Sequence, residues 1–234
     1  MPKPIFFGLG IGPGDVELLT LKAHRILQEV DVLAYPAANG QESLARRIIA
    51  PLIPEDKIEL ELPLPMARER GPGMAAYDAG AEAIRAHLEA GRKVAFLCEG
   101  DPFFYGSFMY LFERLADEFT TEVVPGVTSV TACAAAIGRP LAARNDVLKI
   151  IPGPLDETRI QAEIETADAI AIIKLGKHFA KVRQVIAKLN LTHRAMVIER
   201  ATQGDQKITP LADVPETDHP YFSTLLIYKG GETW

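Results

Sequence analysis

The sequence is poor in the residues that build cysteine- and histidine-based sites. Its 234 residues include two cysteines, Cys98 and Cys133, and each lies inside an apolar segment. Two cysteines exclude a disulfide scaffold and a cysteine-rich zinc site, and they favour buried free thiols. None of the five histidines pairs with another histidine or a cysteine at metal-ligand spacing. We therefore expect no metal in this protein.

Long apolar runs and excess positive charge are also absent. No apolar run approaches the roughly 20 residues of a membrane span, and the apolar segment after Pro4 is too short for a secretory signal. These absences predict a cytoplasmic protein with no membrane partner. The formal net charge of −6 disfavours nucleic acid as a partner. A polyanionic small molecule stays possible if basic residues cluster locally.

What the sequence does have is an alternation of strand-like and helical patterns from end to end. Such alternation is typical of an α/β fold with largely parallel sheets. The expected strands are 5–10, 31–34, 58–62 (at a sheet edge), 94–98, 123–124, 148–151, 169–173, 196–199 and 224–228. The expected helices are 17–29, 41–50, 74–90, 105–118, 129–136, 156–165 and 180–189.

The least regular junction lies near Thr120 and Thr121. It predicts two α/β domains, 1–119 and 120–234, each of ordinary domain size. A single sheet of nine or ten strands is the alternative.

The first expected strand ends in a glycine-rich loop, GLGIGPGD. A dinucleotide-binding G-x-G-x-x-G fails in both registers, because Pro13 or Asp15 stands where the last glycine belongs. Asp15 is instead a predicted N-cap for a helix beginning at Val16. The loop is either a plain tight turn or a place where a ligand approaches the backbone.

A second loop, EGDPFFYGSF, follows the buried strand 94–98. The carboxylate of Asp101 is suited to an ammonium or hydroxyl group of a ligand, and equally to capping the next helix. Phe103 and Phe108 are suited to a wall for a flat ligand or to the core. A third loop of the same type, VPGVTS, places Thr128 and Ser129 at a helix start, where hydroxyls serve as caps or as ligand contacts.

Together these segments resemble the tetrapyrrole methylase family. GLGIGPGDVELLTLKA is similar to its first signature, CEGDPFFYGSFMYLFERL to its second, and VVPGVTSVTACAAAIGRPL to the block that follows. ERATQGDQKI and FSTLLIYKG occupy the places of two late blocks, so the resemblance spans nearly the whole chain. The extended second motif resembles the precorrin-2 C-20 branch, whose members act on precorrin-2 or cobalt-factor II in cobalamin biosynthesis, more than the uroporphyrinogen methyltransferases.

The resemblance implies two α/β domains with mixed, largely parallel sheets, a homodimer, and S-adenosylmethionine folded in a cleft between the domains. Two late positions depart from the family pattern, because Leu175 replaces a common methionine and Ala201 a common glycine. By motif match, the implied cofactor contacts are Pro13, Gly100, Asp101, Pro102, Thr128, Ser129, Leu175, Ala201 and Thr224.

Methyl transfer from a sulfonium to carbon needs alignment and exclusion of water more than a nucleophile or a metal. A base that takes the proton from the methylated carbon is expected at Tyr105 or Glu99. Arginines suit the eight carboxylates of such a tetrapyrrole because they pair with carboxylates in a bidentate manner. The candidate substrate-binding residues are Arg68, Arg70, Arg139, Arg144 and Lys174, with Lys177 and His178 beside them.

Three rival functions remain open at this point. They are a methyltransferase of the same family acting on another carbon or on uroporphyrinogen III, a nicotinamide-dependent oxidoreductase, and a ligand carrier without catalysis.

Overall fold

The chain forms two compact units, Met1–Thr128 and Ser129–Trp234, in a computed structural model that describes residues 4–37, 42–63, 70–215 and 220–230. Each unit contains one five-stranded sheet. The single-sheet alternative is therefore wrong, and the α/β class is confirmed. Among the described residues, no helix combines the length and apolar content that a membrane crossing requires.

The first unit is built on a fully parallel sheet. Its central strands are continuous apolar runs because helices cover both faces, and every residue of Val94–Cys98 is buried. The strand order is β3 (Ile58–Pro63), β2 (Val32–Ala37), β4 (Val94–Cys98), β1 (Ile5–Gly10) and β5 (Thr120–Val124). The edge position predicted for residues 58–62 is confirmed.

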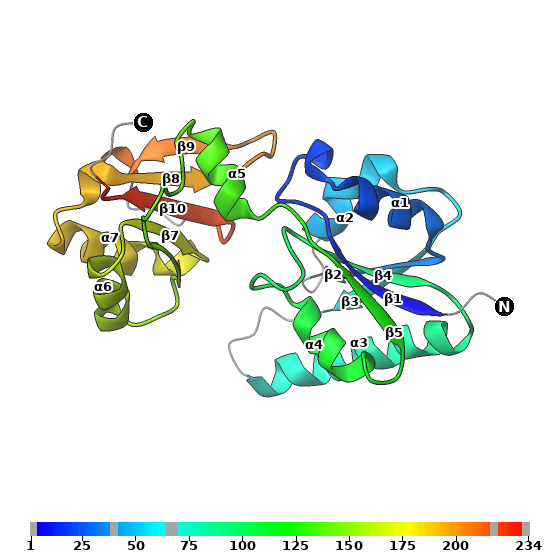
Figure 1. Ribbon diagram of the computed structural model, residues 1–234. Helices are drawn as coiled ribbons and strands as arrows, with labels where there is room; N and C mark the ends of the chain where they lie inside the picture. The colour runs from blue at the N-terminus through cyan, green and yellow to red at the C-terminus, as the bar shows by residue number, and fades with distance from the viewer. Residues whose placement is uncertain (1–3, 38–41, 64–69, 216–219, 231–234) are drawn as a thin grey trace. The chain divides into compact units, whose positions relative to one another are not determined.

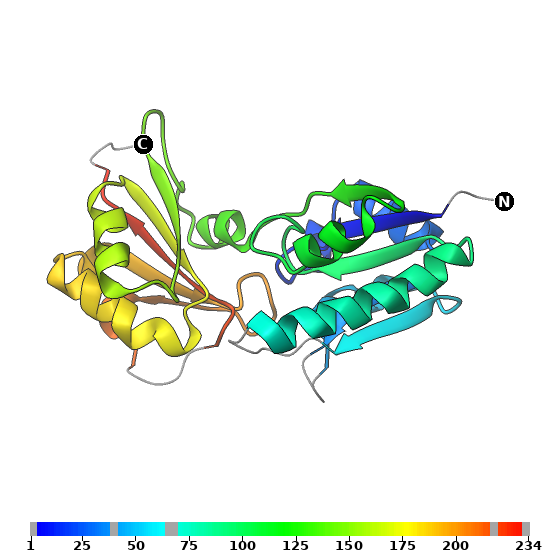
Figure 2. The same cartoon turned by 90° about the horizontal axis from the view of Figure 1, so that it is seen from below.

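Two pairs of helices sandwich this sheet (Figures 1 and 2). On one face, α1 (Leu21–Glu29) and α2 (Leu44–Ile49) pack against inward residues such as Leu9. On the other face, α3 (Arg70–Glu89) and α4 (Phe108–Leu115) form a second cluster, and Figure 2 shows α3 running along the sheet.

The helix predicted over residues 17–29 is divided in the structure. A 3₁₀ turn, Val16–Leu18, comes first, and the side chain of Asp15 accepts the backbone N–H of Glu17 at 2.9 Å, so the predicted N-cap is confirmed. Thr20 then caps α1 by accepting the N–H of Ala23 at 3.1 Å. The two caps lie close in sequence, and each begins its own helical segment.

Strand β5 belongs to the first unit, whereas the division predicted from the sequence placed its residues in the second domain. Residues Thr120–Val124 pair with β1 in the first sheet, and the chain divides after Thr128. The irregular junction near Thr120 is the short turn between α4 and this strand.

The second unit has a mixed sheet. Among its described strands, β6 and β7 pair in parallel, and the other neighbouring strands pair antiparallel. The expectation of largely parallel sheets thus describes the first unit but not the second. Parallel neighbours need a long crossover, and the connection from β8 to β9 is too short for one. The order is β6 (Leu148–Pro152), β7 (Ala169–Ile173), β10 (Ser223–Tyr228), β8 (Ala195–Glu199) and β9 (Lys207–Pro210), of which β9 was not predicted.

Helices α6 (Glu157–Glu165) and α7 (Phe179–Lys188) pack on one face of this sheet, as Figure 1 shows. Helix α5 (Ser129–Ala136) contacts β10. The predicted free, buried state of Cys98 and Cys133 is confirmed.

Candidate functional site

Three loops meet at one edge of the first sheet. Strands β4, β1 and β5 are parallel neighbours, so their carboxyl ends deliver the loops that begin at Glu99, Ile11 and Pro125 to the same edge. The carboxyl edge of an open parallel sheet is the usual place for a ligand. The three loops selected from the sequence are thus brought together by the fold.

Glycines allow the loops to touch through their backbones. A Cβ on Gly126 would lie 2.0 Å from the carbonyl oxygen of Gly100 and 2.8 Å from the Cα of Gly10. A Cβ on Gly10 would lie 2.5 Å from the nitrogen of Gly126. No side chain fits in such a space, so the three-glycine junction of Gly10, Gly100 and Gly126 requires glycine at positions 10 and 126 for lack of room. The contact between Gly10 and Gly126 was not predicted from the sequence, although Gly10 ends β1 and Gly126 closely follows β5.

Backbone hydrogen bonds fasten the first loop to the second. Gly12 and Gly100 form an isolated antiparallel bridge, with Gly100 donating to Gly12 over 2.8 Å. Both have positive φ, 79° and 69°, which glycine adopts without strain. The predicted cofactor contacts Pro13 and Gly100 therefore lie in loops that are joined to each other.

Asp101 joins the second loop to the third. One carboxylate oxygen accepts the N–H of Phe103 at 2.9 Å, and the other accepts the N–H of Gly126 at 3.0 Å. Asp101 therefore does not cap α4, whose N-cap is Ser107. Both of its oxygens are engaged with backbone groups, so its carboxylate orders the loops.

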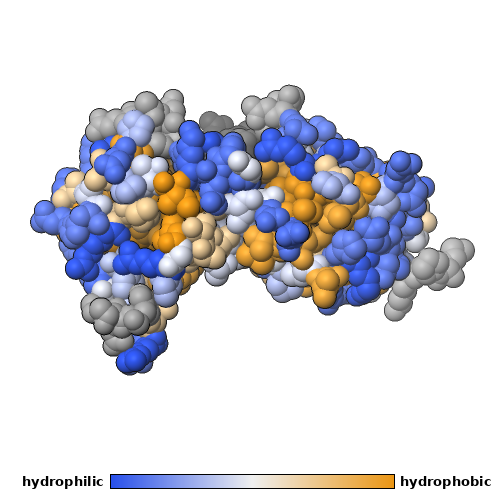
Figure 3. Space-filling model, turned by 90° about the horizontal axis from the view of Figure 1, so that it is seen from above, coloured by the Kyte–Doolittle hydropathy of each residue, from blue (hydrophilic) through white to orange (hydrophobic). Residues whose placement is uncertain are grey.

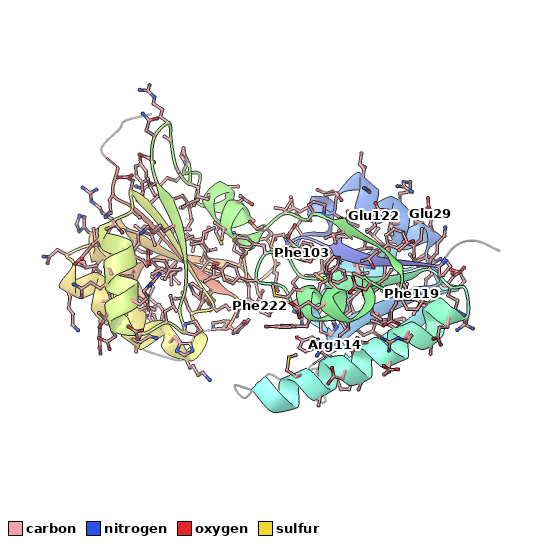
Figure 4. All side chains as sticks on the ribbon, turned by 60° about the horizontal axis from the view of Figure 1, so that its bottom comes forward. Glu29, Phe103, Arg114, Phe119, Glu122 and Phe222 are labelled. Atoms are coloured by element: carbon pink, nitrogen blue, oxygen red, sulfur yellow. The ribbon has the colours of Figure 1, made fainter. Side chains whose placement is uncertain are left out.

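Aromatic residues lie under and around the second loop. Phe108 is fully buried, and its ring lies 5.3 Å from that of Phe6 and 5.7 Å from that of Phe103, centroid to centroid. Phe103 is 48% exposed and lies beside α4 in Figure 4. The sequence left two interpretations for each phenylalanine, a core residue or a wall for a flat ligand. In the structure Phe108 is a core residue, and Phe103 is exposed at the surface.

Glu99 is a half-buried carboxyl at the start of the second loop. Burial raises its pKa, while backbone N–H groups, including that of Ala45 near the start of α2, act in the opposite direction. A carboxylate whose pKa is raised towards neutral pH is a stronger base, which suits a proton acceptor in catalysis.

The raised pKa of Glu99 predicts a pH-dependent stability. Because the folded-state pKa exceeds the unfolded one, stability is lost as pH rises from the ordinary carboxyl range through the raised folded value. We expect Glu99→Gln to remove this loss and to be more stable than the wild type at neutral pH. Urea titrations between pH 4 and 8 check this, with the exposed Glu113→Gln as control; an unchanged pH profile for Glu99→Gln would contradict it.

In the second unit, three predicted cofactor contacts lie near one sheet edge. Strand β10 is antiparallel to β7 and β8, so Thr224 at its start lies near Leu175 and Ala201, which follow the other two strands. All three are buried, and Leu175 belongs to the hydrophobic core. Thr224 also hydrogen-bonds Cys133, and burial raises the pKa of that thiol to about 11.

The predicted substrate-binding residues that the structure describes, Arg139, Arg144 and Lys174, belong to the second unit. Arg139 has its guanidinium 4.9 Å from the ring centroid of Tyr228, a cation–π contact. Arg144 is exposed, with φ of 42°. Lys174 is half-buried at the end of β7, and burial lowers its pKa. Arg68 and the side chain of Arg70 lie outside the described residues.

Comparison with a protein-family model identifies the family of this chain. The model named Tetrapyrrole (Corrin/Porphyrin) Methylases matches residues 6–215. The chain belongs to the tetrapyrrole methylase family. All three loops of the first sheet lie inside the matched region, and so do the strands β6, β7, β8 and β9 of the second sheet, whereas β10 follows its end.

Individual members of the family are similar over nearly the full chain. The precorrin-2 C(20)-methyltransferase of Sinorhizobium sp is 40% identical, covering 94% of this chain and 93% of that protein. The cobalt-precorrin-2 C(20)-methyltransferase of Salmonella typhimurium is 32% identical, with 97% coverage of both. The cobalamin biosynthesis protein CobIJ of Mycobacterium tuberculosis is 41% identical over 96% of this chain, but the chain spans only about half of its length, 46%.

Solved structures of tetrapyrrole methylases share the fold. A cobalt precorrin-4 methyltransferase superposes with a TM-score of 0.73 at 24% identity, covering 96% of this chain and 94% of that one. A uroporphyrin-III C-methyltransferase from Thermus thermophilus, solved with S-adenosyl homocysteine, gives 0.69 at 24% identity and covers 95% and 96% of the two chains.

Proposed function

We propose that this protein is an S-adenosylmethionine-dependent methyltransferase that methylates the C-20 meso carbon of precorrin-2 or its cobalt-containing counterpart in cobalamin biosynthesis. The observation that carries the proposal is the 40% identity, over nearly the whole of both chains, to a precorrin-2 C(20)-methyltransferase. Membership of the tetrapyrrole methylase family supports methyl transfer as the reaction.

The loops at the edge of the first sheet fit the proposed cofactor. They offer backbone amides and carbonyls, the half-buried hydroxyl of Thr128 and the half-buried ring of Pro13, while Pro102, also a proposed contact, is buried. Such groups suit a ligand that has an amino-acid end, a ribose and an adenine. S-adenosylmethionine supplies a methyl group already activated as a sulfonium, and S-adenosylhomocysteine is the product. The remaining proposed contacts are Gly100, Asp101, Ser129, Leu175, Ala201 and Thr224.

The residues of the chain then have three tasks. The joined loops hold the donor in one orientation, which lowers the entropic barrier to an in-line transfer. The aromatic surface around Phe103 excludes water from one side of the second loop. Glu99 or Tyr105 takes the proton from the methylated carbon, and the raised pKa of Glu99 supports Glu99 for this role.

Arg144 is an exposed residue proposed to bind a substrate carboxylate. Losing a charged hydrogen bond of this kind costs about 1.5–3 kcal/mol, so Arg144→Ala should raise the tetrapyrrole KM by about tenfold or more and leave S-adenosylmethionine affinity unchanged. Steady-state kinetics and calorimetry measure the two quantities. Arg25→Ala is the control, since Arg25 is exposed and pairs with Glu29 at 2.9 Å; equal KM values for both variants would remove Arg144 from the site.

The decisive experiment is incubation of the purified protein with methyl-labelled S-adenosylmethionine and precorrin-2, with and without cobalt, followed by NMR assignment of the methylated carbon. Label at C-20 supports the proposal, and the two arms show which form is the substrate. Label at another carbon, or label on uroporphyrinogen III and not on precorrin-2 in a parallel incubation, would instead support the rival methyltransferase. Reduction of a nicotinamide cofactor without methyl transfer would support the oxidoreductase, and cofactor binding without turnover on any precorrin a carrier.

A homodimer and a cytoplasmic location are further parts of the proposal. The apolar surface of the first unit on the side of α1 and α2 supports self-association (Figure 3), and Leu21 at the start of α1 is 89% exposed. Multi-angle light scattering measures the oligomeric state directly.

A further inference from the structure

Tyr105 has an unusual backbone for its residue type. Within the described part of the first unit, it is the only non-glycine residue with φ in the left-handed region, at 57°. This conformation is strained for a bulky side chain, and such residues persist only where the surroundings hold them. A glycine would adopt the same conformation without strain, and the loop already contains Gly100 and Gly106.

The contacts that hold Tyr105 begin at Asp101. The two carboxylate oxygens of Asp101 accept the N–H groups of Phe103 and Gly126, so the loop is fastened both to itself and to the loop after β5. On the far side of Tyr105, Gly106 packs so closely that a Cβ there would lie 2.6 Å from the carbonyl oxygen of Pro102. The loop is therefore closed on both sides of Tyr105.

The strained backbone determines where the tyrosine ring lies. Tyr105 is 42% exposed, and its ring meets that of Phe104 edge-on at 5.2 Å between centroids. The backbone conformation of a residue sets the direction of its Cβ. If φ relaxed to a negative value, the ring would leave this position at the rim of the candidate site.

We propose that Asp101 is a positioning residue that acts through Tyr105. Its carboxylate clasps the second loop to the third, and the clasped loop holds Tyr105 in the left-handed conformation that presents its ring to the methyl acceptor. The contact with the acceptor rests on the proposed function, whereas the effect of Asp101 on the backbone of Tyr105 does not.

The backbone effect is tested by thermal unfolding of paired variants. Tyr105→Gly and Tyr105→Ala both lack the ring, but only alanine is strained at positive φ. In the wild-type background we expect Tyr105→Gly to melt about 2–4 °C above Tyr105→Ala. Asn replaces one accepting oxygen with a donor, so Asp101→Asn should abolish that difference.

Asn190 provides the matched control. It is also left-handed, with φ of 56°, after α7 in the second unit. Asn190→Gly should melt above Asn190→Ala with or without Asp101→Asn. If the difference at Tyr105 also survives Asp101→Asn, or was never present, the clasp does not hold Tyr105 and the proposal fails.

The catalytic effect is tested by a double-mutant cycle on kcat. Asp101→Asn should lower kcat at least tenfold in the wild type but less than threefold in the Tyr105→Gly background, because its effect passes through the tyrosine. An equal fold-loss in both backgrounds, as a merely structural role would give, overturns the positioning role. If the wild type methylates no tetrapyrrole, the proposed function fails, and the unfolding comparison still decides for or against the clasp.

Discussion

Gly126→Ala should destabilise the first unit by about 1–3 kcal/mol, the usual cost of overpacking, and weaken S-adenosylmethionine binding at least tenfold. The added methyl group would lie 2.0 Å from the carbonyl oxygen of Gly100. Its neighbours are backbone atoms of Gly100 and Gly10, which cannot turn aside as a flexible side chain can. The loops must therefore separate, and the proposed cofactor contacts separate with them.

Urea denaturation and isothermal titration calorimetry measure the two effects. Gly204→Ala is the matched control, because Gly204 is exposed and has no atom within 4 Å of an added Cβ. Cofactor affinity at the wild-type level in Gly126→Ala would show that the three-glycine junction does not shape the cofactor site.

Phe108→Ala should lower the free energy of unfolding by about 3–5 kcal/mol, the range for deleting a buried aromatic ring. Phe108 has no exposed surface, and its ring contacts those of Phe6, Phe96 and Phe103. It also fills the space in front of Gly8, where a Cβ would lie 2.6 Å from the ring. Removal of the ring leaves a cavity between α4 and β1.

Phe103→Ala is the control for this change, because it deletes the same side chain from a position that is 48% exposed. It should cost about 1 kcal/mol or less. Equal losses from Phe103→Ala and Phe108→Ala in urea titrations would contradict the assignment of Phe108 to the core and Phe103 to the surface.

Local patterns in the sequence predicted most of the elements. Residues 94–98, 129–136 and 169–173 were predicted with the bounds that the structure has, because apolar runs and glycine or proline at the ends are local signals. The predicted helix over 105–118 begins instead at Phe108, since the loop before it keeps Tyr105 left-handed. That conformation depends on Gly126, a residue distant in sequence, so no local pattern reveals it.

By itself, the sequence determined the α/β class, the three loops and, through resemblance, the family. These depend on residue type and spacing along the chain. Only the tertiary structure decided that β5 completes the first sheet and that the second sheet is mostly antiparallel. It also decided that both carboxylate oxygens of Asp101 accept backbone N–H groups of the loops. Strand pairing and loop-to-loop hydrogen bonds join residues far apart in sequence, so their energies appear only when the chain is folded.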